Sequence, residues 1–317
     1  MADKLTVSIS PHLVNRRLFT PQIMWLVTLS LIPAGAVGVF VFGIQSLWII
    51  VAACISCALM EAVIQKLRGQ KVSIKDGSAV LTGLLLAYNL PPDVPLWLVF
   101  VGCLIAIAIA KQAFGGLGRN IFNPALVGRA FLLSAWPKYM TTFTKPFDTI
   151  TSATPLALIK EGKVTDLTQA GISYMDLLIG NRGGCIGEVC AIALILGAAY
   201  LFYKKIITWH IPFSYLLTVG IFSWIFGSKQ AFFSGDFIFH LLSGGLILGA
   251  FFMATDYVTS PLTFKGQIIF GIGCGLLTCV IRLWGGYPEG VSYAILMMNM
   301  AVPLIDRWIK PKRYGVK

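Results

Sequence analysis

The sequence predicts an all-α integral membrane protein with about ten transmembrane helices. Charged residues make up only 12% of the 317 residues, hydrophobic residues make up 57%, and the mean hydropathy is +0.80. A soluble domain carries about a quarter charged residues, so a surface this poor in charge has to face lipid. Long apolar segments, with basic residues gathered at their ends, also indicate a protein that spans the membrane.

The apolar segments divide the chain into its predicted spans. A helix needs about 20 apolar residues to cross the hydrocarbon core. The third and fifth segments are shorter, and a short helix survives in lipid only when it packs inside protein or lines a cavity. No removable signal peptide is expected, because the polar start lacks a short apolar core with a cleavage site. The spans are residues 22–44, 47–65, 77–90, 95–113, 121–136, 187–203, 210–227, 239–257, 266–284 and 290–308.

The distribution of lysine and arginine predicts that both termini are cytoplasmic, because cytoplasmic loops collect these residues. The loops that then lie outside are nearly bare of them, except for the long loop 137–186, and long loops cross a membrane largely regardless of charge. The net charge of +12 does not indicate nucleic-acid binding, because the basic residues form no single stripe with interleaved aromatic residues.

A weak internal repeat relates residues 76–92 to residues 243–261. Each segment has a small-residue start, a glycine, an apolar stretch, an amide or acid, and then a proline. They form the third and eighth spans, which are five apart and therefore run in opposite directions. This predicts two inverted five-helix repeats, with sites near short or broken helices. The repeats are residues 1–136 and 187–317, joined by the loop 137–186; chance resemblance between glycine-rich segments is the alternative.

A run of hydroxyl residues in the long loop ends at Thr154. Pro155 disfavours the α region at the preceding residue, so Thr154 is expected to be extended. The small residues Ser152 and Ala153 are expected to leave its side chain open to an approaching enzyme. A hydroxyl presented in this way suits post-translational attachment, while a solvated loop that caps a helix from Pro155 is the alternative.

The five residues Asp148, Thr151, Ser152, Ala153 and Thr154 fill the pattern D-x-x-[ST]-[GS]-A-[ST]. This pattern resembles the acceptor motif of a flavin transferase, which joins FMN through its phosphate to the last Thr or Ser. With its ten spans, the chain resembles the RnfD/NqrB family of flavin-carrying membrane subunits. The short segment before the first span favours the RnfD branch. The resemblance also covers residues 76–92, 115–137 and 253–261.

The resemblance implies covalent FMN on Thr154, outside the cytoplasmic (inner) membrane of a bacterium or archaeon, where the transferase acts. The chain would be an electron-transfer subunit, with no complete reaction of its own, of a complex coupling ferredoxin:NAD electron transfer to Na⁺ or H⁺ translocation. Its partners would include an outer flavin-bearing subunit and iron–sulfur subunits, because the sequence has no NAD fingerprint or iron–sulfur cysteine pattern. Lys145 and Lys160 lie near enough to neutralise the phosphate, unless they are solvated loop charges.

Two alternatives belong to other functional classes. One is an inverted-repeat solute channel or transporter without a redox cofactor, and the other is a scaffold subunit that carries no cofactor of its own. The helices would look the same in both, so the acceptor motif is what separates them from the redox subunit.

A glycine-rich segment, residues 115–129, follows the fourth span on the cytoplasmic side. Its glycines permit close approach of the backbone to a ligand, and Arg119, Asn120 and Asn123 offer hydrogen-bond donors. The resemblance implies a second, noncovalent flavin (riboflavin) near the inner face, with these three residues as its possible contacts. A helix cap within a tight packing turn is the alternative.

Polar groups within the spans are costly and mark candidate sites. Asp76 and Asp256 fall at the cytoplasmic ends of the paired short spans, where capping competes with function for Asp76. Three acids near span ends, Glu61, Glu188 and Asp306, are expected to reach water or a basic neighbour. The seven cysteines are expected to behave mainly as small hydrophobes, although Cys185 and Cys190 lie near enough for a local disulfide. No metal-ligand pattern is present in the sequence.

Overall fold

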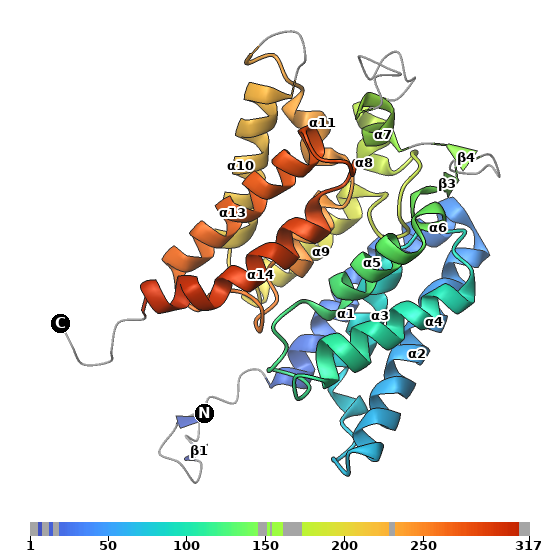
Figure 1. Ribbon diagram of the computed structural model, residues 1–317, viewed down its shortest axis with the longest axis vertical. Helices are drawn as coiled ribbons and strands as arrows, with labels where there is room; N and C mark the ends of the chain where they lie inside the picture. Colours follow the sequence, from blue (N-terminus) through green and yellow to red (C-terminus); the bar gives the residue numbers. More distant parts are fainter. Residues whose placement is uncertain are drawn as a thin grey trace.

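The computed structural model describes residues 6–7, 13–14, 19–144, 151–152, 154–160, 173–227 and 232–310. Within these residues the chain is a bundle of helices with two pairs of very short antiparallel strands (Figure 1). The strand pairs are β1 (Thr6–Val7) with β2 (Leu13–Val14), and β3 (Phe143–Thr144) with β4 (Thr151–Ser152).

The first half of the bundle has two long helices followed by shorter ones. Gly43 joins the long helices with φ +83, a left-handed value that favours glycine. The short helix α3 is almost entirely buried, which confirms that the third span packs inside protein. The elements are α1 (Thr20–Phe42), α2 (Ile44–Leu67), η1 (Ile74–Asp76), α3 (Ser78–Tyr88), α4 (Leu96–Leu104), the π-helix η2 (Ile105–Gln112) and α5 (Pro124–Ala135).

The second half follows a linking segment, and its two longest described helices come last rather than first. The link contains α6 (Pro137–Thr141), α7 (Pro155–Lys160) and α8 (Tyr174–Ile179). The helices that follow are α9 (Ala191–Tyr203), α10 (His210–Phe226), α11 (Phe237–Leu242), α12 (Leu246–Leu248), the π-helix η3 (Gly249–Met253), α13 (Phe264–Leu283) and α14 (Val291–Trp308).

Each of the ten predicted spans coincides with a helix or a helical series. The sixth span begins at Ala191 rather than at residue 187, so Glu188 lies in the preceding loop. The eighth span is broken at residues 243–245, where Gly244 has φ +67. Among the described helices, α1, α2 and α13 are long and apolar enough to cross a membrane alone. Large apolar side chains such as Leu59 and Leu196, 59% and 62% exposed, face outward, as a lipid-facing surface requires.

The two halves share a packing order. In the first half α2 packs against α4, and η2 against α5; in the second half α10 packs against α13, and α13 against α14. The halves meet where α1 contacts α9 and where α5 contacts α14. This packing order is what two related halves require. That the halves are inverted relative to each other, and that they are bounded at residues 136 and 186, stay predictions.

The bundle has two distinct ends (Figure 1). The end that carries α6, α7 and α8 is named the loop end. The opposite end, where α1 begins and α14 ends, is named the terminal end. An even number of crossings places the start of the first span and the end of the last span on the same side, as observed for α1 and α14.

Candidate functional site

Thr154, the predicted attachment residue, lies immediately before α7 at the loop end. Its Oγ1 accepts a hydrogen bond from the backbone N–H of Ala157 at 3.3 Å, as in a helix cap. The side chain is only 4% exposed, so the expectation that it is open to an approaching enzyme is wrong. The reason is that α7 seats Leu156 in an apolar cluster with Leu177 and Phe239.

The rest of the acceptor motif leads up to Thr154 through β4. Thr151 pairs with Thr144, and Ser152 pairs with Phe143, so this part of the motif runs beside the segment that follows α6. Asp148 and Ala153 lie outside the described residues, as do the side chains of Thr151 and Ser152.

Thr154 lines a cavity of about 330 Å³ at the loop end. One wall is apolar, and another carries the stacked rings of Tyr287 and Tyr293, whose centroids are 5.4 Å apart. A planar ring system tethered at Thr154 would find both an apolar wall and aromatic faces here, so these residues fit a flavin. The other lining residues are Arg129, Leu133, Met140, Thr141, Phe143, Ala157, Pro288, Glu289 and Ser292.

Arg129 supplies the positive charge of this cavity, which is named the Thr154 cavity. Its Nη2 forms an ion pair with Glu289 at 2.5 Å, and its Nη1 donates to Asn89 at 2.7 Å and to Ser292 at 3.0 Å. These contacts fix the guanidinium between α3, α5 and α14. Arg129 was not among the residues predicted from the sequence, although an arginine inside a predicted span is itself the signal of a polar site.

The two lysines expected near a flavin phosphate have different outcomes. Lys160 donates from Nζ to the carbonyl oxygens of Ile281 at 3.1 Å and Tyr287 at 2.6 Å, so it caps the end of α13. Partial burial lowers the pKa of Lys160 below its ordinary value. Lys145 lies outside the described residues.

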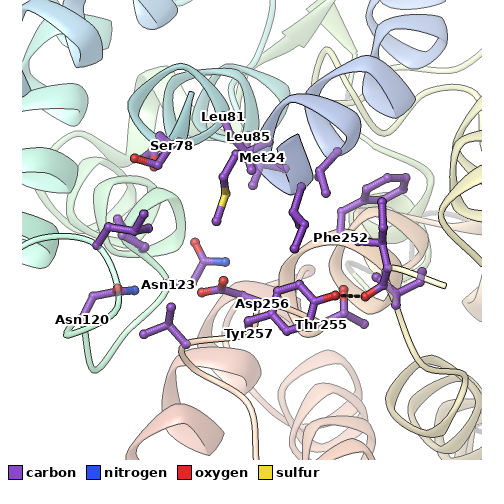
Figure 2. A pocket seen from close by; sticks show the side chains of 18 of the residues that line it. Met24, Ser78, Leu81, Leu85, Asn120, Asn123, Phe252, Thr255, Asp256 and Tyr257 are labelled. Carbon is purple, nitrogen blue, oxygen red and sulfur yellow. Dashed lines mark hydrogen bonds between the residues drawn. The ribbon is translucent and has the colours of Figure 1, made fainter. Parts of the chain in front are cut away.

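A second cavity lies at the terminal end, between α1, α3, α9 and the segment after η3 (Figure 2). Asn120 and Asn123 line it, together with Ser78 and Asp256 from the starts and ends of the paired short spans. Figure 2 shows the side chains of Asn123 and Asp256 reaching this cavity from different elements. Arg119 is exposed and does not line the cavity, so the structure separates it from the two asparagines.

Both asparagines also hold the local fold. Asn123 accepts from the N–H of Ala125 at 3.1 Å, which caps α5, and donates to the carbonyl of Met253 at 3.3 Å. Asn120 donates to the carbonyl of Phe122 at 3.1 Å. The turn before them needs its glycines, because Gly115, Gly116 and Gly118 have φ values of +109, +91 and +87.

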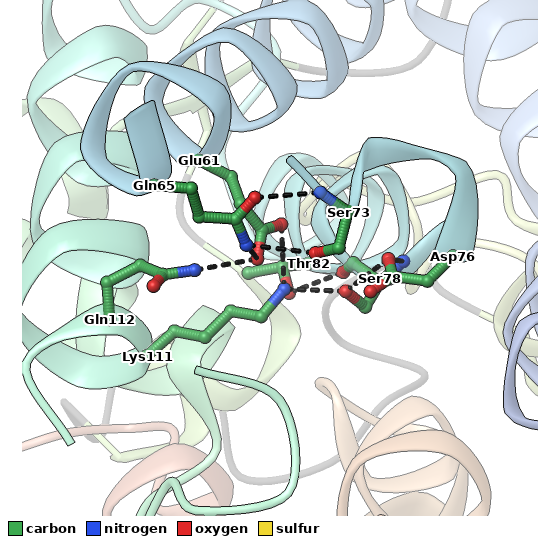
Figure 3. A network of polar contacts seen from close by, with 8 residues as sticks. All are labelled: Glu61, Gln65, Ser73, Asp76, Ser78, Thr82, Lys111 and Gln112. Atoms are coloured by element: carbon green, nitrogen blue, oxygen red, sulfur yellow. Dashed lines mark hydrogen bonds and ion pairs between the residues drawn. The ribbon is translucent and has the colours of Figure 1, made fainter. Parts of the chain in front are cut away.

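A buried polar network borders the same cavity (Figure 3). Lys111 pairs with Glu61 at 2.9 Å and donates to Ser78 at 2.6 Å, while Gln112 donates to Glu61 at 2.8 Å. Glu61 therefore meets a basic neighbour, as expected, although Lys111 was not predicted to be that neighbour. Asp76 accepts from the backbone N–H of Ser78 at 2.9 Å, which is the capping role foreseen for it.

All seven cysteines lie within the described residues and are free thiols, so Cys185 and Cys190 form no disulfide. Cys185 is buried beside two acids, Glu188 and Glu289, and no sequence pattern predicted this group. One ligand atom from each of Cys185, Glu188 and Glu289 lies within 4.8 Å of the others. Glu188, expected to reach water or a basic neighbour, is 3% exposed and has a basic neighbour, because Arg182 donates to its backbone carbonyl at 3.0 Å.

A family model covers almost the whole chain: the model of the NQR2, RnfD, RnfE family matches residues 6–315. The chain belongs to this family. The match spans both halves of this NQR2/RnfD/RnfE protein and includes the acceptor motif between them.

Curated relatives of this NQR2/RnfD/RnfE protein match over nearly their full length. It is 52% identical over 316 residues, 98% of this chain and 96% of the relative, to the D subunit of the Na⁺-translocating ferredoxin:NAD⁺ oxidoreductase complex of Acetobacterium woodii. It is 49% identical over 320 residues, with the same coverage, to the D subunit of the proton-translocating ferredoxin:NAD⁺ oxidoreductase complex of Clostridium ljungdahlii. The D subunit of an ion-translocating oxidoreductase complex of Escherichia coli is 38% identical over 348 residues, 98% of each chain.

Proposed function

We propose that this protein is the D subunit of an ion-translocating ferredoxin:NAD⁺ oxidoreductase complex, and that it carries electrons on FMN bound covalently to Thr154. The subunit assignment is supported by relatives 52% and 49% identical whose names state this activity. The observation that carries the flavin is the cavity of about 330 Å³ that begins at the Thr154 side chain. The last residue of the acceptor motif thus borders a space suited to the ring system.

The residues of the cavity have separate roles in this proposal. Thr154 would hold the flavin through a phosphoester at Oγ1, and the flavin would supply the capacity to accept and donate electrons. Arg129 places a fixed positive charge where electrons add negative charge. The apolar wall formed with Leu133 and Met140 limits the entry of water.

The burial of Thr154 sets an order of events. A transferase has to reach the hydroxyl, yet only 4% of the residue is exposed once α7 is packed. Attachment therefore precedes the packing of α7, or α7 is displaced while attachment occurs. We place the loop 137–186 on the extracytoplasmic side of the inner membrane, where the flavin transferase would act.

The second cavity supports the inner part of the electron path. A single flavin at the loop end does not bridge a hydrocarbon core of about 30 Å. A noncovalent flavin, riboflavin, at the terminal end would shorten each step, with Asn120 and Asn123 as contacts. Electrons would enter from an outer flavin-bearing subunit and from iron–sulfur subunits, and the complex would move Na⁺ or H⁺.

In-gel fluorescence tests the attachment site. The denatured wild-type protein should fluoresce under ultraviolet light, and the Thr154→Ala variant should not, because no other residue completes the motif. Thr142→Ala is the matched control, since this exposed threonine lies just after α6 and outside the motif. Fluorescence that persists in Thr154→Ala would place the flavin elsewhere and defeat the assignment.

A further inference from the structure

A group of buried charges lies beside the Thr154 cavity. It consists of three guanidinium groups, from Arg129, Arg182 and Arg282, and two carboxyl groups, from Glu188 and Glu289. Arg182, Glu188 and Arg282 are 5%, 3% and 4% exposed, and the Glu289 side chain is 13% exposed. Buried charge is costly unless it is paired, so a group this dense calls for a specific arrangement.

Each of these groups has at least one defined partner. Glu289 pairs with Arg129, and Glu188 accepts from the backbone N–H of Cys185 at 3.0 Å through Oε1. Arg182 donates to the carbonyl of Glu188 at 3.0 Å. Arg282 donates to the carbonyls of His240 at 2.6 Å and Ser243 at 3.0 Å, at the end of α11.

The remaining polar atoms converge without partners among the described residues. They are Oε2 of Glu188, Oε1 of Glu289, Nε of Arg282 and Oγ of Ser243. All lie near the break between α11 and α12, where glycines leave room. A Cβ at Gly245 would lie 2.9 Å from Glu188 Oε2, and one at Gly244 would lie 3.4 Å from Glu289 Oε1. Such unpartnered buried atoms indicate a binding site for a small ion or a water molecule.

The hydrogen-bond donors and acceptors of this site determine whether an ion or a water molecule fits. The two carboxylate oxygens require a donor, whereas the Nε–H of Arg282 requires an acceptor. A metal cation would satisfy the oxygens but would face the Nε–H and three guanidinium groups. A water molecule would donate to the oxygens and accept from the Nε–H, and it would bridge the two carboxyl groups for proton exchange.

We propose that Glu188 and Glu289 form a proton-binding site, bridged by water at the α11–α12 break, whose occupancy follows the charge in the Thr154 cavity. Two carboxyl groups this close favour one shared proton over two negative charges. Arg129 connects the site to the cavity, because it lines the cavity and pairs with Glu289.

The titration range of the site is near neutral pH. Burial, and then the charge of Glu289, raise the pKa of Glu188 to about 7, against the opposing charges of Arg129 and Arg182. Burial alone would raise the pKa of Glu289, but the charge and hydrogen bond of Arg129 bring it below its usual range. The buried Cys185 thiol stays neutral because burial raises its pKa.

The coupling to charge rests on the proposed flavin at Thr154. One electron added in the cavity competes with Glu289 for the positive charge of Arg129. The carboxyl pair then takes up one proton from water on the loop side, so that one electron and one proton enter together. When the electron leaves to the next carrier of the complex, the proton is released.

Infrared difference spectroscopy tests the proton site without a flavin. The sample is the purified complex with Thr154→Ala, and the spectra compare pH values below and above about 7. The carbonyl band of a protonated carboxyl group should fall as pH rises, should shift in D₂O, and should be lost on adding Glu188→Gln. Asp93→Asn, at an exposed acid in the turn before α4, is the control that should keep the band. A band that persists in Glu188→Gln overturns the proton site.

Redox titration of the flavin tests the coupling. In the wild-type complex the midpoint potential of the covalent flavin should fall with rising pH in a range that begins near pH 7 and extends above it, because the added electron raises the pKa of the carboxyl pair. Glu188→Gln should lose this dependence. Equal pH dependence in the two proteins overturns the coupling. If Thr154 carries no flavin, the fluorescence test fails while the infrared test still decides the proton site, so the two failures are distinguishable.

Discussion

Two buried cations, Arg129 and Lys111, fix the polar walls of the two cavities. Arg129 holds Glu289 at the Thr154 cavity, and Lys111 holds Glu61 beside the terminal-end cavity. Each links segments far apart in the sequence, so the partner of neither is visible in local sequence patterns. Glu61 was a candidate from the sequence and Lys111 was not, because the lysine sits at the end of an apolar run where a cytoplasmic loop was expected.

Removing Lys111 alone should destabilise the protein strongly. Lys111→Met leaves the Glu61 charge buried and unpaired, which costs about 3–5 kcal/mol. The melting temperature of the detergent-solubilised protein should fall accordingly, while Lys71→Met, at an exposed lysine, should change little. The double variant Glu61→Gln/Lys111→Met should recover most of the loss. A double variant no more stable than the single one would show that the ion pair is not the cause.

A substitution at Asn123 tests the binding of the second flavin without disrupting the fold. Asn123→Ser keeps an oxygen to cap α5, as serine does at helix starts, but removes the amide donor. We expect less releasable flavin on denaturation, with Thr154 fluorescence unchanged. Arg119→Ala should have no effect, because Arg119 is exposed and away from the cavity. Full recovery of releasable flavin in Asn123→Ser would make Asn123 a packing residue only.

Irregular helical segments lie beside both cavities. The two π-helices line the terminal-end cavity, and the break between α11 and α12 lies beside Glu289 of the Thr154 cavity. The π-helix η2 carries Lys111 and Gln112 into the buried network, and η3 presents the Met253 carbonyl to Asn123. Departures of this kind are often found at functional sites. The apolar pattern predicted every span, but it gave no sign of the π windings. The polar contacts of these windings join residues far apart in the sequence, such as Lys111 with Glu61 and Met253 with Asn123. The glycines at 244–245 were visible, and only the structure places the acids against them.

The break between α11 and α12 should tolerate no side chain on the face of Glu188. In Gly245→Ala the new Cβ would lie 2.9 Å from Glu188 Oε2, so the carboxyl group has to move. We expect a lower melting temperature and loss of the infrared carboxyl band. Gly286→Ala is the matched control, because a Cβ there meets nothing within 4 Å. Equal behaviour of the two variants would mean that the break does not hold Glu188 in place.

The whole molecule combines two halves that share a packing order, and each half contributes to both cavities. The Thr154 cavity draws on α5 and on the α13–α14 connection, and the terminal-end cavity on α3 and η3. Composition and span pattern sufficed to predict the membrane bundle, since these depend on local hydrophobicity. The burial of Thr154 and the Glu188–Glu289 pair were not predictable in this way, because they arise where separate segments meet.

The orientation of the bundle in the membrane can be tested with reporter fusions. Alkaline phosphatase fused after Gly162 should be active, because the loop 137–186 is placed outside, and a fusion after Lys317 should be inactive. Expression of the two fusions should be compared by immunoblot. The reverse pattern of activity would put the acceptor motif out of reach of a transferase outside the membrane.

Peptide mass spectrometry tests the central claim most directly. Trypsin should release residues 139–160, because the bond after Lys145 precedes a proline. In the wild-type protein this peptide should be heavier by one FMN less one water, and fragmentation should assign the added mass to Thr154. The unmodified peptide alone, or the added mass on any other residue, would contradict the account.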